Sequence, residues 1–117
     1  MTLDARVQAV IDGGEEADDI LRAALAALHD GTGAAWSAIA FVEEGRMVIG
    51  PLLGAAPGED PAPALAVPIV YRGDAVAALW FGEAPAAALV AELDRAAALL
   101  APYCLVGWDT GGEEWVP

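Results

Sequence analysis

Three side chains of this sequence could take part in nucleophilic or acid–base chemistry: His29, Ser37 and Cys104, each the single residue of its type. A histidine acting as a base needs a nucleophile within hydrogen-bond distance, and no motif around Ser37 or Cys104 indicates such a pair. We interpret His29 as a residue at the end of a helix, where an imidazole suits the negative end of the helix dipole. The sequence therefore predicts no catalytic residue.

Acidic pairs are the other candidates for chemistry, and they occur at residues 15–16, 18–19, 43–44 and 113–114. A calcium site needs several oxygen ligands at a defined loop spacing, which these pairs do not have. A single cysteine can form neither an internal disulfide nor a thiolate metal site. We interpret the acidic pairs as solvated faces and turns, and we expect no metal and no cofactor.

The net negative charge of the chain argues against nucleic acids and anionic membranes as partners. Five arginines, with no lysine, stand against 18 acidic residues, which gives a net charge of −13. Such a surface repels nucleic acid and anionic membranes, so neither is an expected partner. No apolar run reaches the ~18 residues that a membrane span needs, and the N-terminus lacks the pattern of a signal peptide. We expect a cytoplasmic protein.

The length and the hydrophobic pattern predict one domain over residues 1–117. Its 57% hydrophobic content is enough for a core. Residues 16–30 have the clearest helical spacing of apolar side chains. A shorter helix is predicted within a leading segment of residues 1–15, and residues 102–117 are predicted to be an acidic, partly flexible tail. Between these segments we predict strands at 34–43 and 46–53, a loop at 54–63, a hairpin at 65–81 and a long helix at 86–101.

This order of elements predicts an α+β fold. A central antiparallel sheet of about five strands would carry N- and C-terminal helices packed on it. Nothing in the order requires the parallel crossover connections of alternating strand and helix units.

The hairpin has the most distinctive sequence, Val-Pro-Ile-Val-Tyr-Arg-Gly-Asp-Ala-Val-Ala-Ala-Leu-Trp-Phe at residues 67–81. It resembles the late hairpin of a GAF domain, in which an apolar-Pro-Ile strand, a short charged turn with glycine and an alanine-rich strand follow one another. The order of elements over residues 16–101 is similar to that family too. PAS domains and roadblock-type dimerisation domains share similar lengths and patterns.

The resemblance implies a small sensory module with a ligand site on one face of the sheet, roofed by the connection between the early and late strands. That connection, residues 54–63, is short here and leaves little room for a roofing helix. The signature of cyclic-nucleotide-binding members is missing, since the chain has neither lysine nor asparagine. Cys104 lies beyond the predicted last helix, away from where bilin-binding members attach their pigment, and the pocket cysteines of GAF-type methionine sulfoxide reductases are absent.

Aromatic residues on the predicted strands are the best candidates for a ligand site. Trp36 and Trp80 could form the floor of a small site if they share one face of the sheet, with Tyr71 beside them. The alternative is that these rings belong to the core. A shift of one residue in strand register would move Trp36 to the other face, so its position stays open.

The last predicted helix is apolar nearly all round, which predicts a second buried side. Residues 86–101 contain only three charges, and the apolar positions include Leu89, Val90, Leu93 and Leu100. One side would cover the sheet, and the other would need a partner because monomers rarely expose large apolar patches. We therefore predict a homodimer through these four residues, in agreement with the dimerisation of GAF relatives through their first and last helices. The alternative is a helix whose alanines simply tolerate water.

Together with these observations, the resemblance to GAF domains implies a non-catalytic sensory or regulatory domain that binds a small molecule or a protein partner in signal transduction. The alternative is a ligand-free homodimerisation or scaffold domain of the roadblock type.

Overall fold

The computed structural model describes residues 1–14, 16–58 and 61–109, with residues 105–109 as backbone only. The predicted α+β fold is confirmed, with two helices, two hairpins and a last helix in chain order. The elements are α1 (Leu3–Gly13), α2 (Ala17–Thr32), β1 (Trp36–Glu43), β2 (Arg46–Gly54), β3 (Leu65–Tyr71), β4 (Asp74–Phe81) and α3 (Ala87–Asp109).

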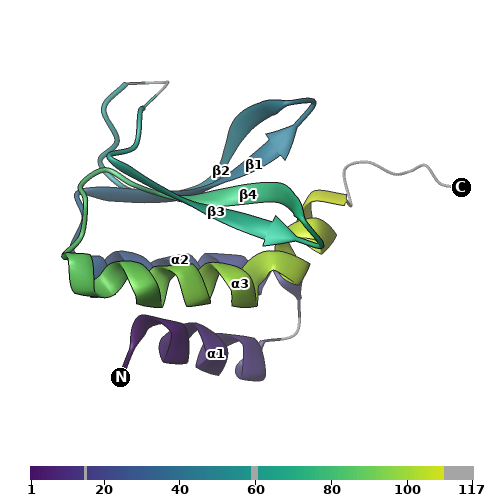
Figure 1. Ribbon diagram of the computed structural model, residues 1–117, viewed down its shortest axis with the longest axis horizontal. Coiled ribbons are helices and arrows are strands. Elements are labelled where there is room, and N and C mark those ends of the chain that lie inside the picture. The colour runs from purple at the N-terminus through teal and green to yellow at the C-terminus, as the bar shows by residue number, and fades with distance from the viewer. Residues whose placement is uncertain (15, 59–60, 110–117) are drawn as a thin grey trace, which may run out of the picture.

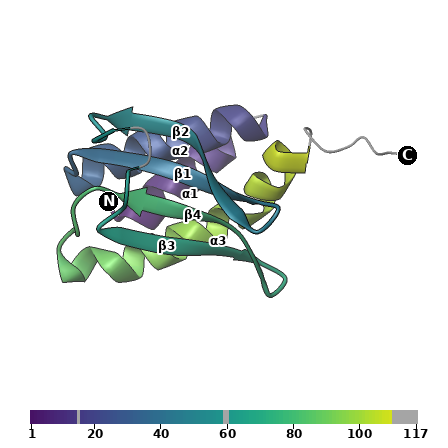
Figure 2. The ribbon, with the colours of Figure 1, turned by 90° about the horizontal axis from the view of Figure 1, so that it is seen from above.

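The described strands form one antiparallel sheet in the order β2-β1-β4-β3 (Figure 2). The sheet has four strands rather than about five, because the described residues between β2 and β3 form no further strand. Each hairpin has a two-residue turn, Glu44-Gly45 in the first and Arg72-Gly73 in the second, and all four residues have positive φ. The twist of such a turn matches the twist of the paired strands. The edge strands β2 and β3 carry Pro51 and Pro68, which hinder pairing with a further strand.

The described helices all lie on one side of the sheet, in two layers. Helices α2 and α3 cover the sheet, and α1 packs on their far side (Figure 1). The core lies between the sheet and these helices. Its largest fully buried side chains include Leu25, Leu28, Ile39, Ile69, Leu79, Phe81, Leu93 and Leu100.

Helix α3 is longer than the sequence predicted, because it continues through Pro102 to Asp109. A proline inside a helix leaves the carbonyl four residues earlier without its N–H partner. Pro102 and Ala98 both lie on the exposed side of α3, where water can reach that carbonyl. The predicted tail therefore begins inside the helix, and Cys104, expected beyond the helix, is buried within it. Residues 110–117 lie outside the described residues.

The second apolar side of α3 is covered by α1 of the same chain. Leu93 and Leu100 have no exposed surface, so they cannot supply the dimer interface that the sequence predicted for them. Leu89 packs against the core from a half-buried position, and Val90 is half-buried. The sequence prediction was wrong for the two leucines because helical periodicity cannot show which segment of the chain covers an apolar side.

Several specific contacts hold α1 in place. Leu3 and Val7 are buried in the core, and the Leu3 backbone N–H donates to Glu92 Oε1 at 2.8 Å. The Thr2 side chain accepts a hydrogen bond from the Ala5 N–H and so caps the helix. Ion pairs join Arg6 to Asp30 of α2 at 3.4 Å and Asp4 to Arg95 of α3 at 3.2 Å. The leading segment is therefore an integral layer of the fold.

The Asp4–Arg95 pair predicts a pH-dependent stability. The hydrogen bond from the Arg95 guanidinium lowers the pKa of Asp4 below its ordinary value of 3.8. A carboxyl whose pKa is lower in the folded state stabilises the fold above its unfolded pKa, and this contribution is lost as the pH falls through the folded pKa. We expect Arg95→Ala to be less stable than the wild type at neutral pH, with the difference disappearing in acid, as measured by urea unfolding at a series of pH values.

Arg22→Ala is the matched control, because Arg22 pairs with Asp18 within one turn of α2, and both side chains are largely exposed. It should change the stability little at any pH. A stability difference between wild type and Arg95→Ala that persists unchanged to about pH 2 would show that Arg95 acts through packing rather than through Asp4.

Candidate binding face of the sheet

Strand register brings the two strand tryptophans to the same face of the sheet. Trp80 is paired with Ala38, and Trp36 accepts a hydrogen bond from the Gly82 N–H at 2.9 Å through its backbone carbonyl. Since side chains alternate along a strand, Trp36, Ala38 and Trp80 point the same way. Ser37, between them, contacts His29 of α2, so the tryptophan face is the one turned away from the helices.

This face, which we call the open face, is apolar throughout its paired positions. An antiparallel sheet with one face toward water normally alternates apolar and polar side chains. Here the strand residues directed to the second face are apolar as well. They are Trp36, Ala38, Ala40, Val42, Met47, Ile49, Leu52, Ala66, Pro68, Val70, Ala75, Ala78 and Trp80.

The open face has a buried centre and an accessible rim. Ala38 and Ala40 are 0% exposed and Ala78 is 6% exposed, although no helix of the described residues lies on this side (Figure 1). They do not belong to the core cluster under the helices, so atoms on the open side cover them. The rim side chains remain accessible, with exposed fractions of 40% for Met47, 36% for Leu52 and 47% for Val70.

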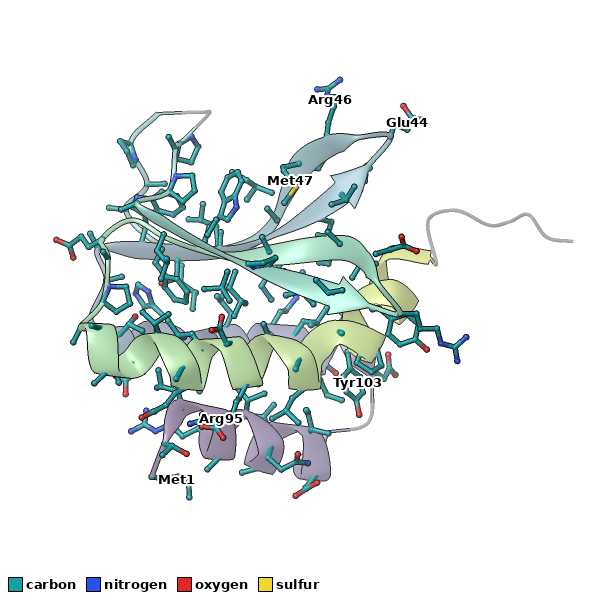
Figure 3. The ribbon with its side chains drawn as sticks, viewed as in Figure 1. Met1, Glu44, Arg46, Met47, Arg95 and Tyr103 are labelled. Carbon is teal, nitrogen blue, oxygen red and sulfur yellow. The ribbon has the colours of Figure 1, made fainter. Side chains whose placement is uncertain are left out.

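Two segments rise from the sheet on the open side and flank this face. They are the β1–β2 hairpin and the described parts of the connection between β2 and β3 (Figure 1). Figure 3 shows Met47 on the side of the hairpin that faces the middle of the sheet, whereas Arg46 points away from it. The hairpin and the described parts of the connection therefore stand on the same side of the sheet as the open face (Figure 1).

The Trp36 indole is held against the backbone of Gly82. A Cβ atom at residue 82 would collide with the indole ring, so only glycine allows this approach. Trp36 itself is 3% exposed, and Trp80 is half-buried. Trp80 is therefore the more accessible of the two rings.

Tyr71, the third predicted site residue, lies on the opposite face. It packs against the core cluster, and the Arg72 guanidinium lies 5.2 Å from the centre of its ring. Along β3 the side chains of Pro68 and Val70 are exposed while Ile69 is buried, so Tyr71 falls on the helix side. The prediction that Tyr71 joins the tryptophans was wrong because neighbourhood along the sequence does not imply a shared face.

The sequence analysis did not identify the alanines at the buried centre of the open face or the residues of its rim. Ala38 and Ala40 could have been identified, because they follow Trp36 by two and four residues and side chains at that spacing share one face of a strand. Met47 and Leu52 could not be placed in this way, because β2 contains a bulge between its pairings with Ala38 and Ala40.

The residues with catalytic potential lie away from the open face. His29 Nδ1 is 2.8 Å from Ser37 Oγ, so the structure does bring the single histidine and the single serine together. Ser37 has no exposed surface, however, and its hydroxyl cannot reach a substrate. The pair links α2 to β1 and satisfies a buried hydroxyl.

Cys104 is a buried thiol with low reactivity. Burial raises its pKa to about 12, so at neutral pH it is not the thiolate that redox and nucleophilic chemistry need. Within the described residues, no group of three or more histidine, cysteine or acidic side chains could hold a metal ion. In the same part of the chain, no helix has the length and apolar character needed to cross a membrane.

Comparison with known proteins identifies the fold. No protein-family model and no curated protein matches the sequence. Among solved structures, the chain is similar to the GAF domain of an Acinetobacter phosphoenolpyruvate-protein phosphotransferase, with a TM-score of 0.73 and 15% identity over 93% of this chain and 94% of the other. It is also similar to a type II free methionine-R-sulfoxide reductase from Thermoplasma acidophilum, with a TM-score of 0.63 and 14% identity over 77% of this chain and 93% of the other. The resemblance that the residue 67–81 hairpin indicated is confirmed at the level of architecture, and this chain has the GAF fold.

Proposed function

We propose that this protein is a non-catalytic regulatory domain that binds a small molecule on the open face of its sheet. The observation that supports the proposal is the apolar composition of that face, which leaves Met47, Leu52 and Val70 accessible to water. Covering these side chains with a ligand would remove apolar surface from water, at about 25 cal/mol for each Å².

A catalytic role has less support from the side chains. One structural neighbour is a methionine sulfoxide reductase, an enzyme. The only cysteine here is buried in α3 with a raised pKa, and the only serine is buried beside His29. A binding role requires none of these groups, whereas a thiol or hydroxyl nucleophile would have to be accessible.

Native mass spectrometry of the purified protein, from gentle to denaturing conditions, tests the proposal. We expect wild-type protein that has been incubated with a metabolite mixture to retain an added mass, which denaturation releases. Leu52→Asp should lose that added mass, because a carboxylate on the apolar rim would have to be desolvated by the ligand. Ala91→Glu, on the exposed side of α3, introduces an equal charge away from the open face and should retain it.

An added mass that Leu52→Asp and Ala91→Glu both retain would place the ligand elsewhere, and the absence of any retained ligand would contradict the proposal.

The same spectra report the oligomeric mass. A homodimer remains a proposal, for which Leu89 and Val90 are the predicted interface residues that are not fully buried.

A further inference from the structure

We infer that the ligand of the open face is a neutral, mostly apolar molecule such as an uncharged aromatic compound, and not a nucleotide, phosphate or carboxylate. This inference rests on the proposed function and adds the chemical class of the ligand. It follows from the charges near the face, the half-buried aromatic ring that belongs to it and the extent of its accessible surface.

The cationic side chains of the chain are placed where they cannot bind an anion on this face. Arg6, Arg22 and Arg95 belong to the helices and form ion pairs there. Arg72 lies over the ring of Tyr71, on the other side of the sheet. Arg46 sits at the end of the β1–β2 hairpin and points away from the sheet (Figure 3).

An anion on the open face would therefore be desolvated without a charged partner. The strand side chains of this face offer no hydroxyl, amide or ammonium group in the described residues, and the net charge of the protein is −13. Burying an unpaired charge is far more costly than burying an apolar group, and the overall potential adds repulsion. Both effects exclude phosphates and carboxylates.

An aromatic side chain belongs to the open face. The three alanines at the centre, Ala38, Ala40 and Ala78, are already covered and offer a ligand almost no surface. The ring of Trp80, paired with Ala38, is only half-buried and offers an aromatic surface for stacking. Offset aromatic pairs are favourable by about 0.5–1.5 kcal/mol beyond the area that they bury.

The accessible surface favours a small molecule over a protein partner. The centre of the face is already buried, and only its rim is exposed. A stable protein interface buries about 800 Å² on each partner, and the two segments that rise beside the sheet would obstruct a flat protein surface. Strand addition is hindered as well, because each edge strand contains a proline.

Two naphthalene dyes that differ in charge test the ligand class. Prodan is neutral, and anilinonaphthalene sulfonate is anionic; the emission of both increases in an apolar site. We expect wild-type protein to bind prodan at least about tenfold more tightly than the sulfonate, a difference of about 1.4 kcal/mol. Leu52→Asp and Met47→Glu should each weaken prodan binding about tenfold or more, whereas Ala91→Glu should leave it unchanged. Met47 is 40% exposed, so its replacement provides a folded variant if Leu52→Asp unfolds.

The possible failures are distinguishable. Sulfonate binding as tight as prodan binding, and weakened by Leu52→Asp, would overturn the neutral class while leaving a binding site on the open face. Prodan binding that all three variants retain would place the dye elsewhere and overturn the inference. If neither dye binds the wild type, the open face is not a small-molecule site, and the proposed function fails with the inference.

Discussion

Replacement of Leu100 by alanine is expected to lower the free energy of unfolding by about 2–5 kcal/mol. Leu100 has no exposed surface and belongs to the cluster between the sheet and the helices. Its removal would lose the transfer energy of the side chain and leave a cavity that the layers around it can only partly fill. Urea unfolding followed by circular dichroism measures the effect.

Val90→Ala is the control from the same helix. Val90 is half-buried, so its loss should cost clearly less than that of Leu100. The comparison also separates a core role from an interface role. If Leu100→Ala left the unfolding of the protomer unchanged but altered the oligomeric mass, Leu100 would be an interface residue and the packing described for α3 would be wrong.

Gly82→Ala is expected to displace the Trp36 indole and to destabilise the protein by about 1–3 kcal/mol, the usual cost of overpacking. The added methyl group would occupy the space of the ring, which rests on the glycine backbone. With Trp36 moved from its 3% exposed position, we expect its fluorescence emission to shift toward longer wavelength. The chain has four tryptophans, so the emission of Trp36 must be separated from that of the others. It is obtained, in the wild type and in Gly82→Ala, by subtracting the spectrum of the protein that also carries Trp36→Phe.

Gly13→Ala is the matched control for this substitution. A Cβ atom at Gly13 meets no atom within 4 Å, and alanine is a better helix former than glycine at the end of α1. It should leave the emission unchanged and the stability equal or slightly higher. Equal effects of Gly13→Ala and Gly82→Ala would mean that the indole does not rest on residue 82.

Most of the secondary structure could be predicted from local patterns. The apolar spacing from Ile20 to Leu28 predicted α2, and the charged turn with glycine at Arg72-Gly73 predicted the second hairpin. The similarity of the 67–81 hairpin to GAF domains predicted the architecture. The end of α3 could not be predicted, because the cost of Pro102 depends on whether water reaches the freed carbonyl.

The candidate site was predicted only in part. Trp36 and Trp80 were identified from their type, and register shows that they share the open face. Tyr71, Leu93 and Leu100 were assigned to surfaces that they do not occupy, since each packs in or against the core. For the two leucines the helical spacing was correct, but the segments that cover them lie far away in the sequence. Tyr71 was misplaced because neighbourhood along the sequence does not imply a shared face of the sheet.

The sequence by itself determined most of the elements and their order, because helix periodicity and turn glycines are local properties. Only the tertiary structure decided which apolar surfaces remain accessible. Helix α1 folds back onto α3 through contacts such as Leu3 with Glu92, while no described helix covers the opposite side of the sheet. Burial depends on contacts between distant segments, and a pattern within one segment cannot reveal its partner.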